Sequence, residues 1–389
     1  MSPQYWKQII VLVSLLIMSS VASFSTTLPR ERKCRSTPLI IVASTAESVT
    51  ADQASSEEEE EVIDTSTMTL LEHVNLNVPS HEYILPFYYD ILGLGMDPRK
   101  AANLRPEETG KKTLWANCGA SQFHLPYGKE AQTMPGHIGL LYPDEESLQA
   151  LEDRLKAHPD AYERYEKSTD PRSGKDFFSI IDKYGNQFCC RIGYSRVKST
   201  WKQPIIGLSE KDVETWGKDV VDRFGRSQKI DCAGISYVEF RCPVGTADKI
   251  ALFYDSVFDA TTSVVQDGTT PVAVVAFGKI TAQGLSDQAL LFRESNEPIP
   301  TYDGHHVAMY VGKSSADFEQ AYKNAELAGV VWVNPRFSDK ADTLEGAKKW
   351  NQFRFKNIVD MDTGKTIFEL EHEIRSVKHE SWPGDIALE

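Results

Sequence analysis

The chain has 389 residues, of which 41% are hydrophobic and 25% are charged, a composition typical of a globular protein with two or three domains. Its formal net charge is −14, and because this field repels a phosphate backbone we expect no nucleic-acid partner. The six cysteines are scattered along the chain without a CxxC pair, which argues against a small disulfide framework.

The N-terminal segment differs in composition from the rest of the chain. Lys7 precedes the apolar run IIVLVSLLIM (9–18), which is too short to span a bilayer comfortably, and the small residues SSVAS follow it. This pattern predicts a signal peptide over 1–23. Residues 24–67 begin as a basic Ser/Thr-rich segment and continue into an acidic stretch with five consecutive glutamates, for which we predict a disordered linker. We therefore expect no stable membrane span in the mature chain.

The order of these segments resembles the bipartite presequence of proteins imported into the complex plastids of algae. In that class a phenylalanine stands just after the signal-peptide cleavage point, and Phe24 stands there in this chain. The resemblance implies a plastid (chloroplast) location. Plain secretion and a signal anchor are the alternatives.

An internal repeat organises the remainder of the chain. Alternating strand patterns at 70–79 and 235–243 each lead into a helical pattern. The first pattern places apolar residues at Ile84, Phe87, Tyr88 and Ile91, and the second repeats this spacing at 250, 253, 254 and 257. Two further strands, GHIGLLYP (136–143) and HHVAMYVG (305–312), each precede a helix and a closing hairpin. The pattern predicts four units, each a strand, a helix and two or three further strands.

We predict that the first two units form one domain (68–195) and the last two a second domain (230–375). The segment 196–229 links them and is predicted to contain an amphipathic helix. We assign the apolar face of this helix to core packing, and its residues are Val213, Trp216, Val220 and Phe224. Residues 376–389 are expected to be a C-terminal tail.

A βαβββ unit used in pairs resembles the vicinal oxygen chelate superfamily, which includes glyoxalase I, bleomycin-resistance proteins and extradiol dioxygenases. The most specific stretches are EHVNLNVPSHEYILPFYYDILGLGM (72–96) and DKYGNQF (182–188). The resemblance implies an α+β fold in which paired units form half-open barrels. It also implies one divalent metal held by residues from the first and last strands of a pair of units.

Carried onto this chain, the resemblance implies a metal site in the first domain formed by His73, His124, His137 and Cys189. Cys189 stands four residues after the hairpin Gly185, where the family usually has a glutamate. Three imidazoles, with or without a thiolate, favour zinc, iron or nickel over magnesium. The absent closing carboxylate puts ordinary lactoylglutathione lyase chemistry in doubt, and the carboxylates that remain nearby in the sequence are Glu72 and Glu130.

The corresponding positions of the second domain are Tyr237, Leu291, His306 and either Phe368 or Glu369. This set does not make a metal site, so we expect the second domain to be a degenerate copy. The resulting hypothesis is a glyoxalase-like, metal-dependent lyase, isomerase or dioxygenase that acts on a small oxygen-chelating substrate through the first domain, with the glyoxalase-like reaction expected first. The alternative is a non-catalytic protein on the same fold that binds a small molecule or serves in assembly. The sequence also leaves open whether the chain forms a homodimer.

Overall fold

The computed structural model describes residues 62–382 apart from 98, 101–102, 104–109, 111–112, 171–172, 194–230 and 283. These residues all lie in one compact unit, residues 37–389. The predicted signal peptide, the presequence, the glutamate run and the amphipathic helix of 196–229 lie outside the described residues. None of the described helices is long and apolar enough to cross a membrane.

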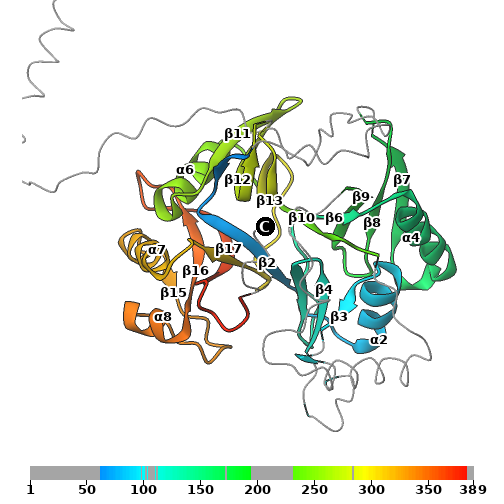
Figure 1. Ribbon diagram of the computed structural model, residues 1–389, viewed down its shortest axis with the longest axis horizontal. Coiled ribbons are helices and arrows are strands. Elements are labelled where there is room, and N and C mark those ends of the chain that lie inside the picture. The colour runs from blue at the N-terminus through cyan, green and yellow to red at the C-terminus, as the bar shows by residue number, and fades with distance from the viewer. Residues whose placement is uncertain are drawn as a thin grey trace, which may run out of the picture. The chain divides into compact units, whose positions relative to one another are not determined.

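The predicted α+β class is confirmed, because each of the four units consists of a strand, a helix and further strands (Figure 1). Unit 1 contains β2 (Met68–Asn75), α2 (His81–Ile84), η2 (Leu85–Ile91), β3 (Gly95–Met96), β4 (Leu114–Cys118) and β5 (Ser121–Leu125). Unit 2 contains β6 (Gly136–Tyr142), α4 (Glu145–Ala157), η4 (Pro159–Ala161), β7 (Arg164–Thr169), β8 (Asp176–Ile181) and β9 (Gln187–Ile192).

Unit 3 contains β10 (Gly234–Pro243), α6 (Ala247–Phe258), β11 (Thr262–Asp267), β12 (Thr270–Thr281) and β13 (Ser286–Ser295). Unit 4 contains β14 (His306–Val311), α7 (Ser315–Leu327), β15 (Val331–Trp332), α8 (Leu344–Trp350), β16 (Gln352–Val359) and β17 (Thr366–Arg375). A short strand, β1 (Val62–Thr65), precedes unit 1 and pairs with β12, so the end of the segment expected to be a disordered linker is a strand.

The predicted helical spacings hold, with one local difference. In α6, Ile250, Phe253 and Val257 are buried on one face. In unit 1 the chain makes one α-helical turn and then a π-helix that has Pro86 near its start. Proline has no backbone N–H to donate and disrupts the regular i to i−4 ladder, which accounts for a widened helix at this point.

The strands form two mixed sheets, and the pairing of the units differs from the pairing predicted. The eight-stranded sheet has the order β15-β16-β17-β14-β2-β5-β4-β3, so it joins unit 1 to unit 4. The nine-stranded sheet runs β1-β12-β13-β10-β6-β9-β8-β7, with β11 on β12, so it joins unit 2 to unit 3. In both sheets the first strands of two units pair antiparallel: β2 with β14, and β6 with β10.

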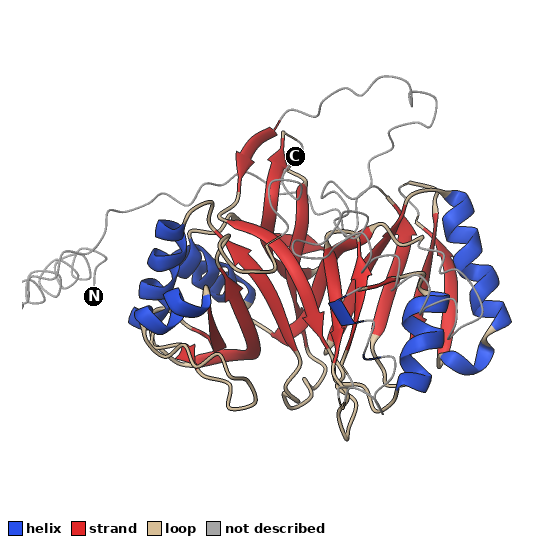
Figure 2. Cartoon of the chain, turned by 60° about the horizontal axis from the view of Figure 1, so that its bottom comes forward, coloured by secondary structure: helices blue, strands red, loops and turns tan. Residues whose placement is uncertain are grey.

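This pairing has a simple physical origin. Within each unit the first strand pairs in parallel with the last, which leaves the other edge of the first strand to pair with another unit. All four units therefore offer an equivalent edge, and proximity in the sequence does not decide which two edges meet. The helices cover the outer faces of the sheets, with α4 against β6 and β9 and α7 against β14 (Figure 2).

Hydrogen bonds connect the two sheets at Gln288 of β13. Its Oε1 accepts from the backbone N–H of Leu71 at 3.0 Å, and its Nε2 donates to Ser121 Oγ at 2.8 Å and to the carbonyl of Ile235 at 2.9 Å. All of these residues are buried. A buried amide with its donors and acceptor satisfied fixes one relative position of the strands it touches.

Candidate metal centre

One face of the eight-stranded sheet carries charged residues although it is buried. Along β17, Glu371, Glu373 and Arg375 alternate with residues that face the opposite, apolar side, and all three are less than 8% exposed. The register places His306 of β14 opposite Glu371, and it places Ala308 opposite both Glu373 and, on the other neighbour, His73 of β2. Strand alternation therefore brings side chains from β2, β14 and β17 to one place on this face.

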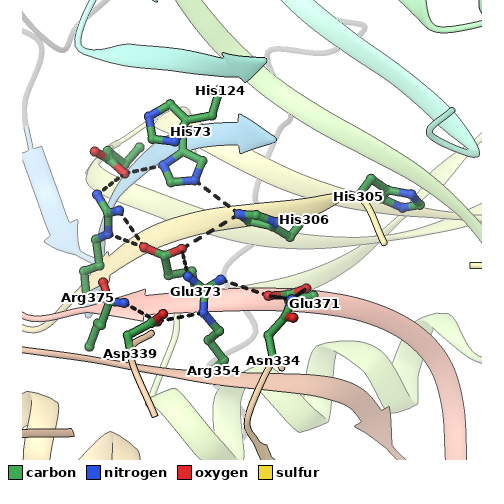
Figure 3. Close-up of polar contacts among 12 residues, drawn as sticks. His73, His124, His305, His306, Asn334, Asp339, Arg354, Glu371, Glu373 and Arg375 are labelled. Carbon is green, nitrogen blue, oxygen red and sulfur yellow. Dashed lines mark hydrogen bonds and ion pairs between the residues drawn. The ribbon is translucent and has the colours of Figure 1, made fainter. Parts of the chain in front are cut away.

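His73, His306 and Glu373 form a group whose ligand atoms all lie within 4.8 Å of one another (Figure 3). The Nε2 atoms of the two histidines are 3.4 Å apart, and His306 Nε2 lies 3.8 Å from Glu373 Oε2. Two nitrogens bound to one ion at about 2.1 Å lie about 3.0–3.4 Å apart for bond angles between octahedral and tetrahedral. The separation of the two histidine nitrogens therefore fits a shared metal ion.

Glu72 fixes the orientation of His73. Its Oε2 lies 2.6 Å from His73 Nδ1, and both side chains are buried. A proton on Nδ1 donates to this carboxylate, and the lone pair of Nε2 then points toward His306. A histidine that binds a metal through one ring nitrogen usually donates the N–H of its other ring nitrogen to a carboxylate or carbonyl, which fixes the orientation of the ring.

Two arginines hold Glu373 in turn. Arg354 Nη2 and Arg375 Nε donate to its two oxygens, the latter at 2.6 Å. Arg375 Nη1 also donates to Glu72 Oε2 at 2.6 Å, and Arg354 reaches Glu371 and Asp339 at 2.8 and 2.9 Å. Each carboxylate oxygen has two lone pairs, so the bonds to arginine leave Glu373 able to coordinate a metal.

The charges of this ion-paired network do not cancel. The carboxylates are Glu72, Glu371, Glu373 and Asp339, and the guanidinium groups are Arg354 and Arg375. The four carboxyls and two guanidinium groups give the network a formal charge of −2 when the imidazoles are neutral, and burial raises the pKa of the Glu371 carboxyl despite its contact with Arg354. Buried uncompensated charge is costly, and a divalent cation between the histidines and Glu373 would balance it.

The protonation states favour metal binding as well. Burial lowers the pKa of both the His306 and the His124 imidazole well below 6.5, so each remains a neutral potential ligand. Burial raises the pKa of the Glu373 carboxyl, but Arg354 and Arg375 outweigh this effect and hold that pKa well below its ordinary value. At Glu72, Arg375 and His73 likewise outweigh burial and lower the pKa to about 2.

His124 lies against this group without joining it. Its ring stacks on that of His73 with centroids 3.6 Å apart, and on the other side it stacks on Trp115 at 4.2 Å. Its Nε2 lies 3.0 Å from Gln122 Oε1. Arg99 and Lys100 lie over the outer face of Trp115, at 4.7 and 4.1 Å from its centroid.

The structure thus divides the four residues predicted to bind metal. It brings His73 and His124 together on the eight-stranded sheet and places His137 and Cys189 on β6 and β9 of the nine-stranded sheet. His137 Nδ1 lies 3.4 Å from Glu239 Oε1, and Cys189 packs in an apolar cluster with Tyr237. The physical reason is the pairing of units: the prediction assumed that unit 1 faces unit 2, whereas it faces unit 4.

Sequence reasoning overlooked two residues of the group. His306 was assigned to a degenerate second domain, because its partner positions were sought in unit 3. Glu373 was overlooked because the last strand was aligned on its hairpin glycine, which pointed to residue 368 or 369, whereas the pairing with β14 places residues 371 and 373 at the site. The available signal was the run of Glu371, Glu373 and Arg375 on one face of a strand whose other face carries Phe368, Leu370 and Ile374.

The comparisons with known proteins agree with the resemblance. Residues 70–190, which span β2 to β9, match the family model of the Glyoxalase/Bleomycin resistance protein/Dioxygenase superfamily. Over these residues the chain is similar to this superfamily, which is the one that the sequence resembles, the vicinal oxygen chelate proteins. A search of curated proteins found no match.

Solved structures similar to the chain include an assumed dioxygenase from Bacillus subtilis, at 14% identity with a TM-score of 0.48, covering 84% of this chain and 92% of that one. Glyoxalase I from Zea mays is 11% identical with a TM-score of 0.46, covering 80% of this chain and 93% of its own. A fosfomycin resistance protein from Listeria monocytogenes is 15% identical with a TM-score of 0.26, covering 32% of this chain and 94% of its own.

Proposed function

We propose that the protein is a metal-dependent enzyme whose one divalent ion is held by His73, His306 and Glu373, and that it acts on a small substrate with two neighbouring oxygens. The observation that carries this proposal is the buried two-histidine, one-carboxylate group with its ligand atoms within 4.8 Å. Such a group leaves several coordination positions open for a substrate and is typical of non-haem ferrous oxygenases. A dioxygenase is therefore the reaction class that the geometry supports best.

When bound, ferrous iron would supply Lewis acidity and redox chemistry with dioxygen. A dioxygenase places both oxygen atoms in its product and so needs no external reductant. His124 would be the residue placed to move a proton beside the substrate, because its ring stacks on His73 and is not part of the proposed ligand group.

A lyase or isomerase with zinc or nickel is the second candidate, and it is less well supported. Proton transfer at a substrate carbon needs a base that is free to move a proton. Glu72 and Glu371, the carboxylates next to the metal group, are held by Arg375 and by Arg354 with Asn334. The glyoxalase type of chemistry expected first from the sequence is therefore not the leading proposal.

Oxygen uptake by the full chain, loaded anaerobically with ferrous iron, tests the dioxygenase proposal. With simple catechols we expect oxygen consumption equal to substrate consumed, and we expect its loss in a His306→Ala variant. A 2-oxoaldehyde–thiol hemithioacetal converted in its place by the zinc or nickel form would establish the lyase instead. A metal-loaded protein inactive on both substrate classes would favour the non-catalytic binding protein.

We also propose that the protein is imported into a plastid, on the strength of the sequence pattern around Phe24. A fluorescent protein fused behind residues 1–67 tests this proposal in an alga with complex plastids. We expect plastid fluorescence that a Phe24→Ala change redirects. Fluorescence that reaches the secretory route with Phe24 intact would contradict import.

A further inference from the structure

Arg191, on β9 of the nine-stranded sheet, has a guanidinium edge that the rest of the described chain leaves unused. Its Nε and Nη2 atoms are both buried and neither has a hydrogen-bond partner. Among the described residues, no other arginine leaves both of these atoms buried without a partner. Burying a guanidinium without a hydrogen-bond acceptor is energetically costly, so we expect an acceptor to bind at this edge.

The same edge binds a carboxylate elsewhere in this protein. Arg99 donates from Nε and Nη2 to the two oxygens of Asp97 at 3.0 and 2.8 Å. Arg293 uses Nε and Nη2 on the two oxygens of Glu239 at 2.9 and 3.1 Å. This side-on fork matches the planar geometry of a carboxylate or two oxygens of a phosphate.

The surroundings of Arg191 form a built site. Its guanidinium carbon lies 5.4 Å from the centroid of the Tyr237 ring, within the range of a cation–π contact. His137 meets the same ring edge-on at 5.3 Å, and its side chain is 31% exposed. An added Cβ at Gly139 would lie 2.2 Å from Tyr237 Cε1, so a glycine is needed there for the ring to lie across β6 toward β9.

The carboxylates of Glu239 on β10 and Asp267 on β11 are already paired. Glu239 holds Arg293 through both of its oxygens, and Asp267 holds Arg293 Nη1 at 2.9 Å. Neither carboxylate contacts Arg191. Among the described residues, no carboxylate pairs with the Nε–Nη2 edge of Arg191, which leaves this edge available to an oxyanion.

We propose that the nine-stranded sheet binds a small organic oxyanion, a carboxylate or a phosphate, on the Nε–Nη2 edge of Arg191, with the Tyr237 ring beneath the guanidinium and His137 at the exposed side. The site uses none of the residues of the metal group. It therefore gives the nine-stranded sheet a binding role that does not depend on the proposed reaction.

The test is calorimetric titration of the full chain with inorganic phosphate and, separately, with pyruvate, at constant ionic strength. We expect one equivalent of at least one of these anions to bind. Binding of phosphate alone identifies a phosphate ligand, and binding of pyruvate alone identifies a carboxylate ligand.

Variants of Arg191 test whether its side chain holds the anion. Arg191→Met should weaken that binding at least tenfold, and Arg191→Lys should weaken it less, because lysine keeps the charge but lacks the two parallel N–H donors. Arg164→Met, at an exposed position on β7 of the same sheet, is the matched control and should bind like the parent.

A second measurement separates a binding role from a purely structural one. Without added anion, Arg191→Met should unfold at the same urea concentration as the parent or at a higher one, because it removes an uncompensated buried charge. The inference is overturned if Arg191→Met binds the anions as tightly as the parent. It is equally overturned if the parent binds neither anion and Arg191→Met unfolds at a lower urea concentration.

Discussion

At the scale of single residues, the candidate metal centre contains groups whose charge is fixed by their neighbours. Glu72 is the clearest example, because it accepts from both His73 and Arg375. Glu72→Gln should weaken metal binding about 10- to 100-fold, since an outer-shell carboxylate on a metal-binding histidine has this effect when it is lost. It should also lower the free energy of unfolding by about 1–3 kcal/mol, because Arg375 and His73 exchange a charged buried acceptor for a neutral one while Arg375 keeps Glu373.

Competition against a chelator measures the affinity, and urea unfolding measures the stability. Glu369→Gln is the matched control, since this glutamate is on β17 but is exposed and pairs with Lys356 at the surface. It should change the free energy of unfolding by no more than about 0.5 kcal/mol. Equal metal affinity in the parent and Glu72→Gln would contradict the assigned role of Glu72.

A second residue-scale prediction concerns pH. Burial lowers the pKa of His372 to about 3, and its Nε2 lies 2.5 Å from the Tyr254 hydroxyl while Nδ1–H donates to the Leu370 carbonyl at 2.7 Å. The unfolded chain takes up a proton near pH 6.5 and the folded chain does not. The stability contributed by neutral His372 is thus complete above pH 6.5 and is lost as the pH falls from 6.5 toward 3.

His124 and His306 shift in the same direction. Each of the three histidines should contribute up to about 1.4 kcal/mol of lost stability per pH unit below 6.5. Urea unfolding of the metal-free chain between pH 7.5 and 5 measures this slope, and His372→Gln should reduce it. A stability independent of pH over this range would show that these histidines are not buried in the neutral form.

At the scale of elements, the sequence predicted the four units but not every strand end. Apolar spacing identified α6 and α7, and alternation identified β2, β6, β10 and β14, because these patterns follow from local geometry. Local geometry did not determine the register of β17. That register depends on bulges in its pairing with β16, between Phe355 and Asn357 and between Ile358 and Val359.

Gly139 allows a test of one strand contact. Gly139→Ala should lower the free energy of unfolding by about 1–3 kcal/mol, because its Cβ would overlap the Tyr237 ring on β10. Tyr237→Leu should relieve the overlap, so the two changes together should cost less than the sum of the single changes. Urea unfolding of the four proteins gives this coupling energy, and strictly additive costs would contradict the contact.

At the scale of the whole molecule, the important result is that unit 1 pairs with unit 4. The candidate ligands Glu373 and His306 come from the end of the chain, some 233 residues or more from His73. Four units with equivalent edges allow several pairings that satisfy the same strand patterns. The sequence therefore pointed to His73 as a candidate ligand but not to its partners in the group, since they follow from tertiary pairing alone.

Because the structure pairs units within one chain, each chain should complete its own metal group. Co-expression of a His73→Ala chain with a His306→Ala chain tests this prediction. Each chain then lacks one ligand, and we expect the mixture to contain as little metal as either variant alone. A mixture that regains metal would show that units are exchanged between the chains of a dimer.

The most direct test of the central claim is the metal content of the full chain, without a histidine tag, in matched pairs of variants. We predict about one equivalent of a divalent transition metal in the parent, retention of that metal in His137→Ala/Cys189→Ser, and its loss in His306→Ala/Glu373→Gln with the fold intact. Loss of metal in the first pair and retention in the second would contradict the site on the eight-stranded sheet.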